Sequence, residues 1–163
     1  MEIKIIKVDY LDSRHGPDVG YLLNGYSQDP MGASKALPEH VKNNLAGELA
    51  KLPHAFSVIS YVDNEPAGLI NCFVGFSTFK CKPLVNIHDI YVDGEYRGLK
   101  LSHKMLDKVV EIAKSKGCCK LTLEVLEGNQ VARSSYQKFG FSGYGLDPEL
   151  GSASFWEMNL SED

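Results

Sequence analysis

The segment from Leu84 to Val125 constrains the fold more than any other part of the sequence, because it has the pattern of a strand, a helix and a second strand in direct succession. The β-rich run LVNIHDIYV comes first, apolar side chains recur at helical spacing from Leu99 to Lys116, and alternation returns at Leu121. Two strands joined by such a helix lie parallel, with a right-handed crossover. The segment therefore predicts a parallel strand pair within one sheet.

The segments on either side of this unit alternate between strand and helix patterns. Pro38 fits the first turn of a helix, and Pro53 ends that helix. Asn129 is a suitable cap for a short helix after the parallel unit. The expected strands are 2–8, 55–62, 67–79, 84–92, 121–125, 141–144 and 154–160, and the expected helices are 14–26, 39–52, 99–116 and 129–140.

Together these elements indicate one α/β (or α+β) domain over residues 1–163. A chain of this length can bury about two-thirds of its unfolded surface in a single core. Only the unit from Leu84 to Val125 requires parallel strands. We therefore expect a single mixed, mostly antiparallel central sheet with helices on both faces.

Composition and charge exclude several function classes. No apolar run is long enough to span a bilayer, and the N-terminal MEIKIIKVDY lacks the pattern of a signal peptide, so we expect a cytoplasmic protein with no membrane partner. A net charge of −4 argues against nucleic-acid binding. The cysteines show no CxxC pair and no histidine at zinc-binding spacing, so we expect no metal and interpret them as buried free thiols: Cys72, Cys81, Cys118 and Cys119. Of the vicinal pair Cys118–Cys119, which starts an apparent strand, we expect at most one side chain to face the core.

The stretch YRGLKLSHKML, at the start of the helix in the parallel unit, suggests an anion site. Backbone N–H groups at a helix N-terminus have no intrahelical partner, and the helix dipole is positive there. Gly98 allows close approach to the backbone, and Arg97, Lys100 and Lys104 add positive charge. The alternative is an ordinary strand-to-helix turn with a solvated basic face. The spacing does not match the P-loop GxxxxGK[ST].

Two linked motifs give this stretch a context. The first is NIHDIYV followed by DGEY and RGLKLS; the second, downstream, is LEVLEGNQVARSSYQKFGF. Both resemble signatures of the GNAT N-acetyltransferase superfamily, whose phosphate loop is roughly Arg-Gly-x-Gly-x-Gly or Ala. The resemblance extends over essentially the whole element order. It implies the GNAT fold, with the parallel pair splayed between 88–92 and 121–125.

The resemblance also implies acetyl-coenzyme A as co-substrate. Its pyrophosphate would rest on the loop formed by Arg97, Gly98, Leu99, Lys100, Leu101 and Ser102. Its pantetheine arm would follow the strand at Ile90, Tyr91 and Val92, and the second motif would add Asn129, Arg133 and Tyr136. Lys100 replaces a usual glycine and Ser102 a usual glycine or alanine. We expect Lys100 to adopt an ordinary helical conformation, with its ammonium folded back onto the phosphates; the alternative is weakened cofactor affinity.

For the chemistry, Tyr136 matches the tyrosine commonly assigned as general acid in this superfamily. The general base would be His88 or Asp89, and we rank His88 first because histidine titrates near neutral pH. These neighbours point to opposite faces of a regular strand, unless a bulge intervenes.

Three functions are compatible with these motifs. The first is transfer of the acetyl group to a primary amine of a small molecule. The second is acetylation of protein N-terminal or lysine amines, and the third is a coenzyme A-binding regulatory module without turnover. In this superfamily the acceptor pocket forms from segments that correspond here to Tyr21–Leu37 and Gly143–Ala153. Neither identifies an acceptor, and a homodimer is one option for assembly.

Overall fold

The structure is a computed structural model that describes residues 1–143 and 147–161. The chain forms two compact parts, Met1–Leu126 and Glu127–Asp163. The first part contains the sheet, and the second contains the last helix.

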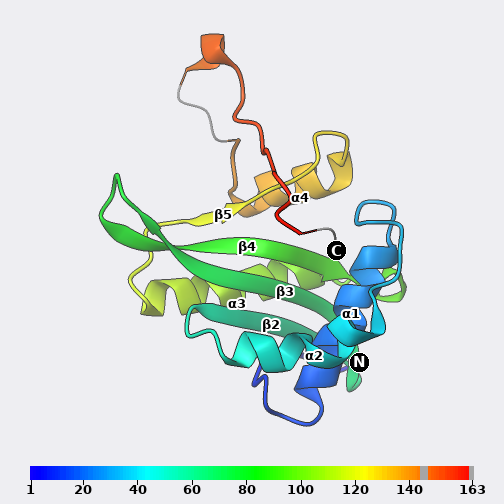
Figure 1. Ribbon diagram of the computed structural model, residues 1–163. Coiled ribbons are helices and arrows are strands. Elements are labelled where there is room, and N and C mark those ends of the chain that lie inside the picture. Colours follow the sequence, from blue (N-terminus) through cyan, green and yellow to red (C-terminus); the bar gives the residue numbers. More distant parts are fainter. Residues whose placement is uncertain (144–146, 162–163) are drawn as a thin grey trace. The chain divides into compact units, whose positions relative to one another are not determined.

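The first part is built on a five-stranded sheet with strand order β1-β2-β3-β4-β5. Its strands are β1 (Ile3–Lys7), β2 (Ala55–Val62), β3 (Glu65–Ser77), β4 (Lys82–Val92) and β5 (Leu121–Leu123). The first four strands pair antiparallel in sequence order, and β5 lies parallel to β4 (Figure 1). This confirms the predicted mixed sheet and its parallel unit. Strand β5 is shorter than the expected 121–125.

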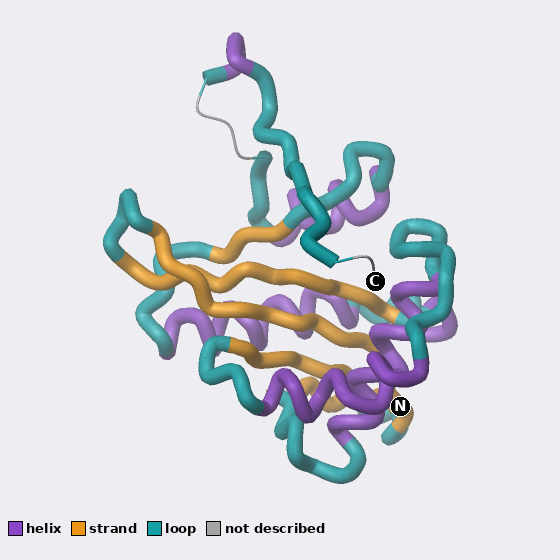
Figure 2. The backbone as a smooth tube through the Cα atoms, in the orientation of Figure 1, coloured by secondary structure: helices purple, strands orange, loops and turns teal. Residues whose placement is uncertain are grey.

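Helices cover both faces of this sheet, as predicted. Helices α1 (His15–Gln28) and α2 (Glu39–Ala50) lie on one face, and α3 (Leu101–Ser115) lies on the other (Figures 1 and 2). On the α1 side, Val19 and Leu22 pack against the sheet in a buried cluster with Ile59 and Leu69.

On the opposite face, α3 buries the wide apolar stripe read from the sequence. Leu101, Met105, Leu106 and Val109 are almost fully buried. Gly68 of β3 lies under this helix, and a Cβ placed there would lie 2.8 Å from the Met105 methyl carbon. Glycine at this position thus lets α3 pack closely on the sheet, and a larger residue would require the Met105 side chain to move.

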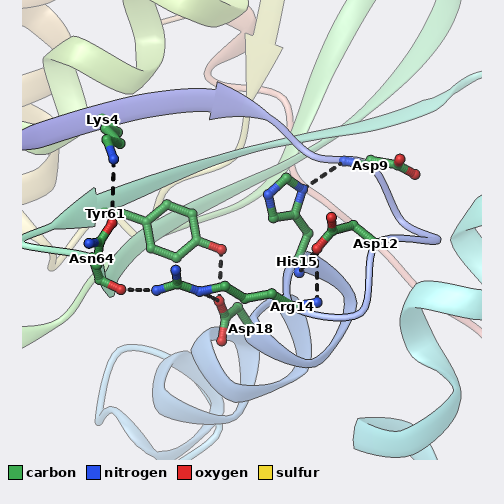
Figure 3. A network of polar contacts seen from close by, with 8 residues as sticks. All are labelled: Lys4, Asp9, Asp12, Arg14, His15, Asp18, Tyr61 and Asn64. Atoms are coloured by element: carbon green, nitrogen blue, oxygen red, sulfur yellow. Dashed lines mark hydrogen bonds and ion pairs between the residues drawn. The ribbon is translucent and has the colours of Figure 1, made fainter.

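A polar cluster fastens the start of α1 to the β2–β3 hairpin (Figure 3). The Tyr61 hydroxyl donates to Asp18 Oδ2 at 2.7 Å, and Arg14 Nε lies 3.6 Å from the same oxygen. The Arg14 guanidinium also lies 4.7 Å from the centre of the Tyr61 ring and donates to the Asn64 carbonyl. These contacts fix the register of α1 on the sheet and so the position of its C-terminal half.

The second part contains α4 (Gln130–Phe139). The Asn129 side chain accepts from the Ala132 N–H at 3.2 Å, which confirms the predicted cap. At the other end, Gly140 has a φ of 129° and the Phe141 N–H returns to the Tyr136 carbonyl. A short 3-10 turn follows at Pro148–Leu150.

The two strands expected after α4 do not form in the described residues. Phe141 belongs to the helix end, and Tyr144 lies outside the described residues. The segment 154–160 has the predicted alternation, but Trp156, Met158 and Leu160 are 87%, 81% and 91% exposed. An alternating segment forms a strand only when a neighbouring strand pairs with it and a core covers its apolar face.

The cysteines are free thiols, but they are not all buried. Cys72 is buried and Cys118 is half-buried, whereas Cys81 and Cys119 are exposed. The prediction of a buried thiol is therefore wrong for Cys81, whereas the vicinal pair agrees with the expectation that at most one of its two side chains faces the core. Among the described helices, none has the length and apolar character needed to cross a membrane.

Candidate active site

The parallel strands β4 and β5 separate in the middle of β4. Their last paired residues are Ile87 and Leu123, whereas β4 continues to Val92. Among the described strands, none pairs with 88–92 on the β5 side. The predicted splay is therefore present along 88–92, but residues 121–123, which the prediction placed in it, pair with 85–87. The splay leaves an open backbone edge on β4.

A β-bulge at His88 sets which backbone groups face that edge. Asn71 pairs with Asp89 and Cys72 pairs with Ile87, so His88 is an extra residue in β4. Before the bulge, the Val85 N–H points toward β5, where it donates to the Lys120 carbonyl.

After the bulge, the alternation has shifted by one residue. The Asp93 N–H donates to the Ala67 carbonyl of β3, so the backbone of Tyr91 also faces β3. The N–H and C=O groups of Ile90 and Val92 therefore face the open edge. Of the three residues predicted to contact the pantetheine arm, two present their backbone groups there.

The bulge also brings the side chains of His88 and Asp89 to the same face. The His88 ring lies 5.6 Å from the ring of Phe73, which packs against the core under α1 and α2. Asp89 accepts from Asn71 Nδ2 at 3.0 Å on that same face. The expectation of opposite faces holds only for a regular strand. His88 is exposed and Asp89 is half-buried.

A cavity of about 210 Å³ lies between α1 and the end of β4. Its lining includes Tyr21, Asn24 and Gln28 of the segment predicted to form the acceptor pocket, together with Tyr91 and Asp93. Gly25 admits the Tyr91 ring, because a Cβ at Gly25 would lie 2.8 Å from the Tyr91 hydroxyl.

Burial and nearby carboxylates raise the pKa of two phenols, Tyr91 in the cavity lining and Tyr26 of α1. Burial, and then the charges of Asp89 and Asp29, raise the pKa of Tyr26. Burial, and then the charges of Asp93 and Asp29, raise the pKa of Tyr91. Both hydroxyls are therefore neutral near pH 7. The charge of Arg97, which pairs with Asp29, offsets part of the carboxylates' effect on Tyr91.

The loop between β4 and α3 is shaped by two residues with positive φ. Gly98 has a φ of 87°, and Lys100, at the cap of α3, has φ 57° and ψ 32°. The expectation of an ordinary helical conformation for Lys100 is therefore wrong. The left-handed conformation is the one that glycine adopts freely, which accounts for the usual glycine at this place in the motif.

The amides of this loop are available to a ligand. Within the part of the chain that the structure describes, no protein acceptor is found for the N–H groups of residues 98–102. Arg97 is 68% exposed and forms an ion pair with Asp29 at the end of α1, at 3.5 Å. Lys100 and Lys104 are exposed, so their charges add to the positive helix terminus.

The remaining predicted site residues lie in the second part of the chain. Asn129 caps α4, and Arg133 donates to the Glu127 carbonyl at 3.0 Å. The Tyr136 ring packs edge-on against Phe141, with ring centres 6.0 Å apart. The structure brings these three residues together on one short helix. Among the described residues, no three His, Cys, Asp or Glu side chains gather in a metal-binding arrangement.

Sequence reasoning missed three polar residues that are connected to Asp89 through successive hydrogen bonds: Asn71, Ser57 and Tyr10. Ser57 and Asn71 are buried in β2 and β3 and linked by hydrogen bonds. The signal was a polar residue at an inward position of each apolar run, in AFSVISYV and LINCFV.

The family model described as "Acetyltransferase (GNAT) family" matches residues 21–141. The chain belongs to this family. A thialysine N-epsilon-acetyltransferase of Bos taurus is 40% identical over 83 residues, which cover 47% of each chain. The chain thus spans about half the length of the first curated relatives it matches. A putative [ribosomal protein bS18]-alanine N-acetyltransferase of Bacillus subtilis (strain 168) is 28% identical over 114 residues, 70% of this chain and 72% of the relative.

Solved GNAT structures share the fold. An aminoglycoside acetyltransferase from an uncultured soil metagenomic sample, in complex with sisomicin, has a TM-score of 0.78 at 14% identity, covering 98% of this chain and 97% of that one. AAC(6')-Iy, in complex with a bisubstrate analog, CoA-S-monomethyl-acetylneamine, has a TM-score of 0.77 at 15% identity, with 98% and 100% covered. At these identities the likeness establishes the fold alone.

Proposed function

We propose that this protein transfers the acetyl group of acetyl-coenzyme A to a primary amine of a small molecule. The observation that carries the proposal is the open edge of β4, which leads directly into a loop with unpaired amides. An extended ligand ending in phosphates fits such an arrangement: backbone groups along the strand bind the arm, and helix N-terminal amides bind the anion.

Several residues of the site support acetyl-coenzyme A as the co-substrate. Ile90 and Val92 offer N–H and C=O groups to the amides of the pantetheine arm, and residues 98–102 offer amides to the pyrophosphate. The left-handed conformation of Lys100 preserves the loop shape that glycine would give. When bound, the co-substrate supplies an acetyl thioester for direct attack by the amine.

The protein's own residues would manage the protons. The acceptor must lose a proton before it attacks, and the departing thiolate must gain one. His88 and Asp89, on one face beside the open edge, are the candidates to receive the first proton. Tyr136 is the candidate to donate the second, with Asn129 and Arg133 holding the cofactor from α4.

The cavity beside α1 supports a small acceptor. A volume of about 210 Å³ suits part of a small molecule, and the Asp93 carboxylate in its lining suits a cation. The name of the bovine relative, a thialysine acetyltransferase, also denotes a small amine. One observation favours protein amines instead: the Bacillus subtilis relative, named for ribosomal protein alanine, matches more of the chain than the bovine one.

The test measures thiol release from acetyl-coenzyme A with a panel of small amines and N-terminal peptides, beside calorimetric titration with coenzyme A. Turnover with small amines supports the proposal, and turnover with peptides alone supports the protein-amine alternative. Binding without turnover on any acceptor would contradict an enzymatic function and indicate a regulatory module.

A further inference from the structure

A chain of hydrogen bonds crosses the sheet and ends on Asp89. The Tyr10 hydroxyl, in the segment after β1, lies 2.7 Å from Ser57 Oγ of β2. Ser57 Oγ lies 2.6 Å from Asn71 Oδ1 of β3, and Asn71 Nδ2 lies 3.0 Å from Asp89 Oδ2 of β4. This hydrogen-bond series thus connects the segment after β1 with β2, β3 and β4.

The chemistry of these groups fixes the direction of every bond. An ionised carboxylate only accepts, so the Asn71 amide nitrogen must face Asp89 and its carbonyl must face Ser57. Ser57 has one hydrogen and gives it to Asn71, so Tyr10 must donate to Ser57. All the donors therefore point toward Asp89, an arrangement in which each bond polarises the next.

The two middle residues of this hydrogen-bond series, Ser57 and Asn71, are buried at positions where an apolar side chain would pack well. Ser57 is 0% exposed and Asn71 is 3% exposed, and the neighbouring inward residues are apolar. Burial raises the pKa of the Tyr10 phenol, whereas its hydrogen bond with Ser57 lowers it, and the net effect is upward. Tyr10 therefore remains a donor at neutral pH. Such a series of hydrogen bonds holds Asp89, its last acceptor, in one orientation more firmly than a single hydrogen bond would.

Asp89, the last acceptor in this series, has no counter-ion in the part of the chain that the structure describes. Among the described residues, no Lys, Arg or His forms an ion pair with Asp89, and no donor is found on its Oδ1. Asp89 is half-buried on the α1 face beside the open edge, close enough for its charge to act on Tyr26. A half-buried carboxylate with one oxygen fixed and one oxygen open is suited to a cation from solution.

We infer that Asp89 binds the ammonium group of the acceptor through Oδ1, and that Asn71, Ser57 and Tyr10 are positioning residues that act through it. The inference rests on the proposed function and narrows its substrate class. The acceptor is an aliphatic amine, charged in water, and not an arylamine, which is neutral at pH 7. Removal of the acceptor's proton then falls to His88 on the same face.

The first test uses steady-state kinetics with the best aliphatic amine of the panel. Ser57→Ala should raise the KM for the amine by about 10-fold while the KM for acetyl-coenzyme A stays unchanged. Ser60→Ala is the matched control, because Ser60 is a 0% exposed serine of the same strand whose Oγ has no hydrogen-bond partner among the described residues. It should change neither KM.

A double-mutant cycle shows whether Ser57 acts through Asp89. In an Asp89→Asn background, Ser57→Ala should raise the amine KM no further, while its effect on Tm should persist. If Ser57→Ala raises the amine KM equally in both backgrounds, or lowers only Tm, the positioning role is refuted. Efficient acetylation of an arylamine by the wild-type protein would also overturn the inference.

A binding measurement separates this inference from the proposed function. If the wild-type protein acetylates no amine, the proposed function fails, and 1,3-diaminopropane is then titrated while the side-chain NH2 signals of Asn71 are followed by NMR. Shifts in the wild type and in Ser60→Ala, but not in Asp89→Asn, would support ammonium binding at Asp89. Unchanged signals in the wild type would refute it.

Discussion

Asn71 of β3 donates from Nδ2 to Oδ2 of Asp89, its partner in β4, at 3.0 Å. The extra residue of β4, His88, lies directly before Asp89. The same irregularity shifts the backbone alternation of β4, so that Ile90 and Val92 face the open edge. One inserted residue therefore serves both halves of the proposed site. It turns the Asp89 side chain to the α1 face, where we propose that the acceptor binds, and it leaves Ile90 and Val92 facing the edge where we propose that the cofactor binds.

Lys100→Gly should stabilise the protein. A non-glycine residue in the left-handed region is strained relative to glycine, and here φ is 57°. We expect the free energy of unfolding to rise by about 1 kcal/mol, measured by urea denaturation. Lys104→Gly, one turn into the same helix, is the control and should lower it by about 1 kcal/mol. A loss of stability in Lys100→Gly would show that the lysine side chain makes contacts outweighing the strain.

The same variant tests the role of the Lys100 ammonium in cofactor binding. If the ammonium folds onto the phosphates, Lys100→Gly should change the Kd for acetyl-coenzyme A only modestly and weaken its dependence on salt. If the side chain only obstructs the loop, the variant should bind clearly tighter. A large loss of affinity would instead identify Lys100 as a principal phosphate ligand. Isothermal titration at low and high salt distinguishes these results.

The sequence predicted the features that depend on neighbouring residues. The parallel unit, the cap at Asn129 and the α3 stripe follow from spacing within one segment, and the motifs added the splay beyond His88. The conformation of Lys100 was not predicted, because a lysine gives no local sign of positive φ. It is imposed by the sharp entry into α3.

Features that depend on pairing between distant segments could not be read from the sequence. The bulge at His88 depends on the register of β3 against β4, and the chain from Tyr10 to Asp89 depends on three strand pairings at once. The expected strand at 154–160 does not form for the same reason: the segment alternates, but a strand also needs a neighbouring strand to pair with.

Ser102→Glu should prevent the stabilisation of the protein by acetyl-coenzyme A. Ser102 lies in the first turn of α3, where a carboxylate would repel the pyrophosphate and occupy its space. A ligand that binds only the native state raises Tm, and we expect this rise in the wild type but not in the variant. Asn43→Glu, an exposed position on α2, adds the same charge elsewhere and should keep the rise. A full rise in Ser102→Glu would place the cofactor at another site.

Tyr61→Phe should flatten the loss of stability at alkaline pH. Burial, and then the hydrogen bond to the Asp18 carboxylate, raise the pKa of Tyr61 above its ordinary value of 10.0. A group whose pKa is raised on folding contributes stability that is complete below the unfolded pKa and is lost as pH rises above it. Urea unfolding between pH 8 and about 11 should therefore show a shallower decline in the variant. At pH 7 the lost hydrogen bond should lower stability by about 1–2 kcal/mol. Parallel declines would exclude Tyr61 as a contributor.

The last prediction concerns Tyr136 as the proton donor to the departing thiolate. Tyr136→Phe keeps the ring that packs against Phe141 and removes one oxygen, so α4 should remain folded. If the phenol donates a proton in the transition state, kcat should fall by about 10²-fold or more while the KM for acetyl-coenzyme A changes little. A thioester with a much more acidic leaving thiol provides the decisive comparison, because its thiolate departs without a proton. The variant should recover most of its lost rate on that thioester. Equal impairment on both thioesters would show that Tyr136 positions the cofactor and does not act as the acid.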